Sequence, residues 1–378
     1  MLNNKRILFA TGGTGGHINP ALAVAGLIRE TCPGAEILFV GTPDKIEARL
    51  VPAAGFDLKT IDITGFLRTF NLTGLKRNIS TVSKLFKASS QAKQILRDFK
   101  PDAVIGMGGY VSGPVLRMAA KMKIPTAIHE QNAYPGVANR ALAKKADCIM
   151  LTVEKAREHL KSKAPFVLTG LPIRGDIISA DREKSRMELG LDDRPLVLSM
   201  GGSLGAGEIN KAIAELIAAK CAAADCYFLH ATGQSSVSVA DILRDRGIDL
   251  EKEKHIMIRT YINDMERCLS AADLVISRAG ASSLSEIQAM GKPSILIPSP
   301  NVAENHQFHN AMALVEKDAA VIIQEKELTG ERLTREVDGL LSNPARMAEI
   351  GANAKKMAVY DAAQRIVDCI DKLAAGEK

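Results

Sequence analysis

The chain has 378 residues, 46% hydrophobic and 24% charged. One hydrophobic core rarely organises more than roughly 250–300 residues, so this length and composition predict two globular domains and exclude a disordered chain. Residues 1–170 hold 24 Lys and Arg against 12 Asp and Glu, whereas the remainder holds 25 against 31. A basic first half indicates an anionic partner, but nucleic acid is disfavoured because aromatics are only 4%, Trp is absent and no recognition motif is found.

The six cysteines are scattered and form no Cys-x-x-Cys pair, which favours reduced thiols over disulfides. Met1 leads into a strand pattern without a signal peptide, and no apolar run approaches the ~20 residues of a transmembrane helix. The sequence has no Asp-x-Asp and no His, Cys and Asp cluster with metal-ligand spacing. We therefore expect a soluble cytosolic or peripheral protein with no built-in metal site and no cofactor.

In chain order, an apolar strand pattern at 7–10 enters a glycine-rich turn and then a helical pattern from Pro20 to Ile28. The same alternation continues, which is typical of parallel βαβ units. Ligands of such sheets bind at the carboxyl ends of the strands. Further strands of this half are expected at 36–40, near 56–63, and at the start of 103–110 and 125–132, the last two running into polar loops.

The segment 165–174, with two prolines and a glycine, is the predicted domain boundary. The pattern then restarts with a strand at 195–200, a glycine loop at 201–207 and a helix from Asn210. The predicted domains are 1–168 and 169–355, with a C-terminal helix at 356–378 that packs back on the first domain. The fold class predicted is α/β, with two Rossmann-like domains. Strands of the second half are expected at 226–230, 255–258, 273–277 and 294–297.

The glycines from Gly12 to Gly16 allow a positive φ and a close approach to a ligand, and the helix that follows offers free N–H groups to phosphate. The turn fits neither the Gly-x-Gly-x-x-Gly fingerprint nor a P-loop. The alternative is a tight turn without a ligand.

His17 follows this turn, where a neutral imidazole is suited to accept a proton from a sugar hydroxyl. Glu130 and Asn132 follow a predicted strand, and Tyr110 is expected to face the same strand-end crevice. The alternatives are that His17 caps or braces the loop and that Glu130 only satisfies backbone groups.

In the second half, 278–286 opens a helix with small residues and free N–H groups, which suit a diphosphate. Glu286 is a candidate acceptor for ribose hydroxyls, although Ser283 and Glu286 also have the spacing of a capping box. Arg174 supplies positive charge for a leaving diphosphate. The segment 305–307 is predicted to be a polar loop that either reads sugar hydroxyls or is only solvated.

The stretch 65–87 mixes large apolar residues with cations, a composition that suits docking on an anionic bilayer. The alternative is an ordinary amphipathic helix with its apolar stripe in the core. The cations are Arg68, Lys76, Arg77, Lys84 and Lys87, and the apolar residues are Phe66, Leu67, Phe70, Leu72, Leu75, Ile79, Val82, Leu85 and Phe86.

Five motifs together resemble the MurG family. They are Gly-Gly-Thr-Gly-Gly-His at 12–17, Gly-Met-Gly-Gly-Tyr-Val-Ser-Gly-Pro at 106–114, His-Glu-Gln-Asn at 129–132, Gly-Gly-Ser-x-Gly at 201–205 and Arg-x-Gly-Ala-x-x-x-Ser-Glu at 278–286. The resemblance implies a GT-B fold with a cleft between the domains. It also implies an inverting transfer of N-acetylglucosamine from UDP-N-acetylglucosamine to lipid I, giving lipid II in peptidoglycan synthesis at the cytoplasmic face of the membrane, with other cell-wall synthesis proteins as possible partners.

By resemblance, His17 is the base on the acceptor hydroxyl, with Tyr110 and Glu130 on the acceptor side. Other readings stay open: a different acceptor such as diacylglycerol, a UDP-sugar 2-epimerase, or a non-catalytic UDP-sugar-binding subunit. The residues assigned by resemblance to the donor are Thr14, Gly15, Gly16, Asn132, Arg174, Ser203, Ile262, Ala281, Ser282, Ser283, Leu284, Ser285, Glu286 and Gln307.

Overall fold

The computed structural model describes residues 2–63 and 72–376, and for 72–84 it gives the course of a helix without side chains. The chain forms two compact units, one of Met1–Pro172 with Asp361–Lys378 and one of Ile173–Tyr360. The first unit runs to Pro172 rather than to residue 168, and this division lies within the predicted boundary segment 165–174. The C-terminal part of this unit begins at 361 rather than 356.

The first unit contains a parallel sheet of seven strands centred on β1 (Arg6–Ala10). Ile7 of β1 lies opposite Ile37 on one side and Ala103 on the other, so the strand is paired along both edges. Such strands are buried on both faces, which explains their continuous apolar sequences. The strand order is β3 (Asp57–Thr60), β2 (Glu36–Gly41), β1, β4 (Ala103–Gly106), β5 (Thr126–Glu130), β6 (Cys148–Leu151) and β7 (Phe166–Leu168).

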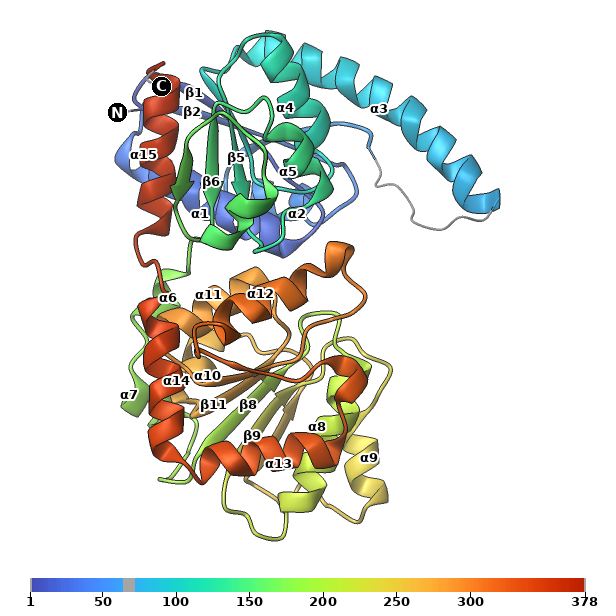
Figure 1. The fold of residues 1–378 in the computed structure, drawn as a ribbon, viewed down its shortest axis with the longest axis vertical. Helices are drawn as coiled ribbons and strands as arrows, with labels where there is room; N and C mark the ends of the chain where they lie inside the picture. Colours follow the sequence, from blue (N-terminus) through green and yellow to red (C-terminus); the bar gives the residue numbers. More distant parts are fainter. Residues whose placement is uncertain (1, 64–71, 377–378) are drawn as a thin grey trace. The chain divides into compact units, whose positions relative to one another are not determined.

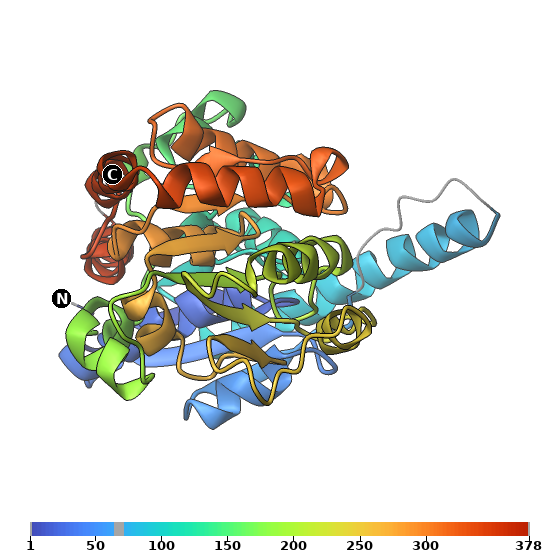
Figure 2. The same ribbon diagram turned by 90° about the horizontal axis from the view of Figure 1, so that it is seen from below.

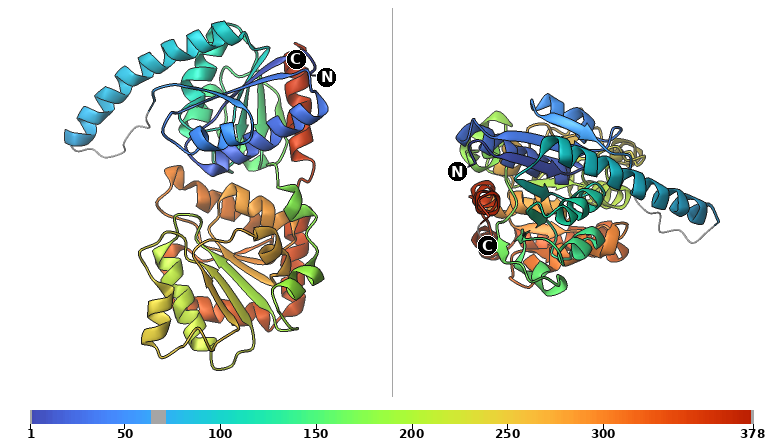
Figure 3. Two further views of the ribbon diagram at one scale, coloured as in Figure 1. Left: turned by 180° about the vertical axis from the view of Figure 1, so that it is seen from behind. Right: turned by 90° about the horizontal axis from the view of Figure 1, so that it is seen from above.

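Helices cover both faces of this sheet (Figures 1 and 3). Ile7 and Phe9 point into a core formed with α1 (Gly15–Thr31) and α15 (Ala362–Ala374). Leu8 points the other way, toward α3 (Leu72–Phe99) and α4 (Ser112–Lys121). The C-terminal helix thus completes the core of the first unit.

The second unit repeats this plan with six parallel strands around β8 (Leu196–Met200). One face is covered by α8 (Gly207–Lys220), α9 (Val239–Asp245) and α13 (Gly330–Leu341), which lie together in Figure 2. The other face is covered by α10 (Met265–Ala271), α11 (Ala281–Ala289), α12 (His306–Val315) and α14 (Pro344–Lys356). The order is β10 (Ile256–Arg259), β9 (Tyr227–Ala231), β8, β11 (Leu274–Ser277), β12 (Ser294–Leu296) and β13 (Val321–Ile322).

Both sheets reverse their strand order beside the first strand, between β1 and β4 and between β8 and β11. Such a switch point is where open α/β sheets bind ligands. The predicted α/β fold with two Rossmann-like domains is confirmed. The remaining elements are α2 (Glu47–Ala53), α5 (Val137–Leu142), α6 (Gly175–Ile178), α7 (Arg182–Glu188) and short 3₁₀ turns at Glu154–His159, Ala303–Asn305 and Glu325–Glu327.

Candidate active site

Two glycine loops meet at the switch point of the first sheet. Gly108 and Gly109, after β4, have φ values of 101° and 83°. A Cβ on Gly109 would lie 2.1 Å from the carbonyl oxygen of Gly12, and one on Gly108 would lie 2.5 Å from Nδ1 of His17. These glycines are therefore required for the loop after β4 to pack against the glycine turn.

A buried carboxylate, which the sequence did not predict, holds this turn in place by hydrogen bonds. Glu47, at the start of α2, is fully buried. Its Oε2 accepts the Gly13 amide at 3.0 Å, and its Oε1 accepts the amide and hydroxyl of Thr42 at 3.0 and 2.7 Å. Glu47 thus links the loop after β1 to the loop after β2, and a Cβ on Gly41 would lie only 2.6 Å from its Cγ.

His17 is oriented by Gln131. Gln131 belongs to the sequence motif at 129–132 but was assigned no role of its own there. The Gln131 side chain is buried, and its Nε2 donates to the Met107 carbonyl at 3.2 Å. That bond fixes the orientation of the amide, so Oε1 faces His17 Nδ1 at 2.7 Å. Because a carbonyl oxygen only accepts, His17 Nδ1 must carry the proton, and Nε2 is the unprotonated nitrogen of the neutral ring. The geometry prepares His17 Nε2 to act as a base.

The neighbouring His129 is unsuited to that role. Its ring is fully buried, and Nε2 donates to the Gly170 carbonyl at 2.9 Å. Burial lowers the pKa of His129 to about 4, with a smaller contribution in the same direction from His17. His129 therefore stays neutral near pH 7 and supports the loop.

Glu130 is engaged entirely by its own loop. Its Oε1 accepts the backbone and side-chain amides of Asn132 at 2.9 and 3.2 Å, and its Oε2 accepts the Gly136 amide at 3.2 Å and Asn139 Nδ2 at 2.8 Å. Burial raises the pKa of Glu130, and these hydrogen bonds oppose the rise. The geometry favours the bracing alternative for Glu130, whereas Tyr110 is 62% exposed in the loop after β4.

The second sheet has a matching glycine loop after β8. Gly202 and Gly205 have φ values of 87° and 74°, and a Cβ on Gly205 would lie 2.4 Å from the Thr232 carbonyl oxygen. The loop after β8 therefore packs closely on the loop after β9. Ser203 and Leu204 stand exposed at its tip.

Helix α11 starts at the carboxyl end of β11, with Gly280 as its N-cap and no side-chain cap. Ser283 lies inside the helix, so the capping-box alternative for Glu286 is wrong. Burial raises the pKa of Glu286 to about 7, while the Arg174 guanidinium, 3.8 Å away, opposes the rise. The first turn of α11 and the Glu286 carboxyl thus form a polar site that has no capping duty.

The other sequence candidates of this unit lie in its core, on α12 or within α11. Ile262 packs in the core at 4% exposure. Gln307 Oε1 accepts the Ser299 amide at 2.9 Å. The prediction of a polar loop at 305–307 is wrong for its last two residues, because α12 begins at His306. Leu284 and Ser285 are buried within α11, and Ala281 to Ser283 are half-buried.

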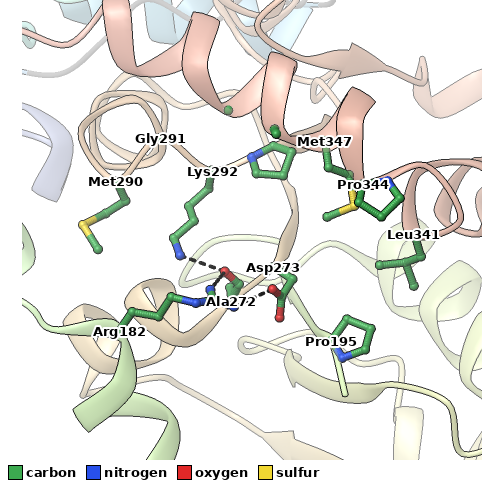
Figure 4. A pocket seen from close by; sticks show the side chains of 13 residues that line it. Arg182, Pro195, Ala272, Asp273, Met290, Gly291, Lys292, Leu341, Pro344 and Met347 are labelled. Carbon is green, nitrogen blue, oxygen red and sulfur yellow. Dashed lines mark hydrogen bonds and ion pairs between the residues drawn. The ribbon is translucent and has the colours of Figure 1, made fainter. Parts of the chain in front are cut away.

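A cavity of about 480 Å³ lies at the opposite edge of this sheet, lined by residues that precede β8, β11 and β12 (Figure 4). Lys292 is buried there and donates to the carbonyls of Ser270 and Ala272 at 2.6 and 2.8 Å. Burial lowers the pKa of Lys292 to about 7. Because ligands bind at the carboxyl ends of parallel strands, this cavity is not the candidate active site.

Two Rossmann-like units, each with a glycine loop and an uncapped helix start at its switch point, are the architecture of a GT-B glycosyltransferase. Two protein-family models support this class. The glycosyltransferase family 28 N-terminal domain matches residues 7–151, and the family 28 C-terminal domain matches residues 196–366.

Related enzymes and a solved structure identify the family within this class. The chain is 43% identical to the UDP-N-acetylglucosamine–N-acetylmuramyl-(pentapeptide) pyrophosphoryl-undecaprenol N-acetylglucosamine transferase of Acetivibrio thermocellus, over 97% of both chains. It is 41% identical to the enzyme of the same name from Desulforamulus reducens, over 97% of this chain and 98% of that one. The crystal structure of Acinetobacter baumannii MurG matches with a TM-score of 0.77 and 29% identity, covering 97% of this chain and 99% of that one. The chain belongs to glycosyltransferase family 28 and, within it, to the MurG family.

Replacing Glu47 by Gln is expected to loosen the glycine turn. The amide nitrogen of Gln does not accept, so the Gly13 amide or the Thr42 donors lose their buried partner, at a cost of about 1–3 kcal/mol in the free energy of unfolding. We expect a lower Cm in urea and slower turnover. The exposed neighbour Asp44 provides the control, Asp44→Asn, and equal behaviour of the two variants would refute the bracing role.

Proposed function

We infer that this enzyme transfers N-acetylglucosamine from UDP-N-acetylglucosamine to lipid I and so forms lipid II in peptidoglycan synthesis. The observation that carries the inference is the similarity to transferases of that name, at 43% and 41% identity over 97% of the chain. The oriented imidazole of His17, set at the ligand-binding edge of the first sheet, supports it independently.

The proposed mechanism is a single inverting displacement. His17 Nε2 accepts the proton of the acceptor hydroxyl while that oxygen attacks the anomeric carbon and the UDP diphosphate leaves. Gln131 holds the ring in the tautomer that leaves Nε2 basic. Such a displacement needs one base and a stabilised leaving group, and no covalent enzyme nucleophile.

We assign the donor to the second unit. The free N–H groups at the start of α11 suit the diphosphate, and Arg174 adds positive charge 3.8 Å from Glu286. Glu286 is assigned to the ribose hydroxyls. The other proposed donor residues are Thr14, Gly15, Gly16 and Asn132 from the first unit and Ser203, Ile262, Ala281, Ser282, Ser283, Leu284, Ser285 and Gln307 from the second. Tyr110 is proposed to contact the acceptor, and Glu130 to hold the acceptor-side loop.

Transfer of labelled N-acetylglucosamine to a lipid I analogue tests the function directly. We expect turnover by the native enzyme and a fall of about 10²–10⁴-fold in kcat for His17→Ala, because general-base catalysis contributes about that much. The dissociation constant for UDP-N-acetylglucosamine is expected to change little. Absence of turnover by folded native protein would reject the acceptor, and an unchanged kcat in the variant would remove His17 from the chemistry.

Replacing Gln131 by Glu is expected to shift the pH dependence of kcat/KM. A carboxylate facing Nδ1 favours the protonated imidazole, so His17 stays charged to higher pH and the acidic limb of the profile moves to higher pH. Gln131→Met, which cannot accept from Nδ1, should lower kcat without that upward move. A profile for Gln131→Glu that superimposes on the native one would contradict the positioning role.

We also propose that the first unit docks on an anionic membrane through the stretch 65–87. Most of this stretch lies outside the residues whose side chains the structure describes, but Phe86 is 77% exposed and Lys87 is on the surface, 2.6 Å from Asp62. None of the helices in the described part of the chain has the length and apolar character to cross a bilayer. Other cell-wall synthesis proteins are proposed as further partners at this location.

Charge reversal of Lys76, Arg77, Lys84 and Lys87 to Glu tests the docking surface. We expect roughly 10³-fold weaker binding to anionic liposomes, because each of the four cations near the surface contributes about 1 kcal/mol, and unchanged turnover of a soluble acceptor. Lys93→Glu, on the exposed side of the same helix, is the control. Unaltered sedimentation of the fourfold variant would refute the proposal.

A further inference from the structure

Three chemically different metal-binding side chains meet in the second unit, away from the glycine loops. Cys221 follows the last turn of α8, and Glu253 and His255 immediately precede β10, the edge strand of the sheet. One ligand atom from each side chain lies within 4.8 Å of the other two. Because His255 precedes its strand, the group lies at the amino-terminal edge of the sheet, opposite the candidate donor site.

The imidazole of His255 lacks the partner that a buried polar ring normally has. The residue is only 6% exposed, and Nε2 has no hydrogen-bond partner. The nearest charged oxygen to Nδ1 is Glu253 Oε2 at 3.5 Å, a separation too long for a good hydrogen bond. Its backbone is fixed, since the Phe228 amide donates to the His255 carbonyl at 2.8 Å. Nδ1, which faces Glu253 without a good hydrogen bond, is therefore the ring nitrogen available to an ion in this group.

The spacing suits a tetrahedral zinc ion. Zinc binds nitrogen, oxygen and thiolate ligands at about 2.0–2.3 Å, which sets neighbouring ligand atoms roughly 3.3–3.8 Å apart. The 3.5 Å between His255 Nδ1 and Glu253 Oε2 falls in this range. Cys221, at a helix end and half-buried, needs only a small side-chain movement to close the set.

A cavity of about 530 Å³ opens beside the group and is lined by Cys221 and Glu253. It offers a path of entry and room for a water molecule as the fourth ligand. A thiolate and an imidazole together favour zinc over magnesium or calcium, which prefer oxygen ligands. With the thiolate and the carboxylate both charged, the ion would be neutralised by its own ligands.

We propose that Cys221, Glu253 and His255 bind one zinc ion that ties the end of α8 to the start of β10. The ion stabilises the second unit at the edge of its sheet and takes no part in glycosyl transfer.

Metal titration of the full-length, metal-free enzyme tests this site. Zinc in hundredfold excess over its dissociation constant should raise the melting temperature by roughly 5–10 °C. Cobalt(II), used as a spectroscopic probe, should give a thiolate-to-cobalt charge-transfer band that saturates at one cobalt ion per enzyme chain. Cys221→Ser and His255→Gln should lose both signals, whereas Cys369→Ser, a half-buried thiol of the first unit, should keep them.

Turnover of Cys221→Ser should equal that of the native enzyme, because the group lies far along the sheet from the proposed donor contacts. If His255→Gln does not fold, Cys221→Ser carries the test, since its side chain is less buried. A native enzyme that shows no cobalt–thiolate band, or a zinc-induced shift that persists in Cys221→Ser, would overturn the proposal.

Discussion

The first unit depends on the close packing of two glycine loops, the carbonyl of Gly12 against the backbone of Gly109. No side chain fits between them, so the loops that follow β1 and β4 pack directly on each other at the switch point. Gly108 can then lie under the His17 ring, and Gln131, from the next strand, reaches Nδ1. The proposed base is therefore oriented by backbone packing and one buried amide.

Burial and hydrogen bonding give three buried or partly buried glutamates of the molecule two different roles. Glu47 and Glu130 are buried, and their oxygens are occupied by donors of the surrounding loops, so they stabilise loop geometry. Glu286 lies on α11 near Arg174 and Asp176, and burial raises its pKa to about 7. An acid in that setting is suited to accept ligand hydroxyls. We thus propose the base in the first unit and the nucleotide contacts in the second.

The sequence predicted the repeated strand, glycine loop and helix because periodicity and glycine position are local signals. It did not identify β6, β7 or β13, and it assigned 165–174, which contains β7, to the domain boundary because prolines flank that strand. Glu47 and Gln131 were not assigned because their partners come from distant strands. The Ser283 capping box failed because α11 begins two residues earlier, at Ala281. The expectation of no metal cluster came from local spacing, whereas the fold brings Cys221 to residues that precede β10.

Nitrogen NMR of the enzyme labelled in its histidine rings tests the central claim most directly, because the chemical shifts of Nδ1 and Nε2 distinguish the two neutral tautomers. The His17→Ala spectrum assigns the signals. The orientation by Gln131 predicts a neutral His17 ring with its proton on Nδ1, and loss of that preference in Gln131→Met. A native ring that carries its proton on Nε2 would contradict the account, because the nitrogen proposed to accept the acceptor's proton would already be occupied.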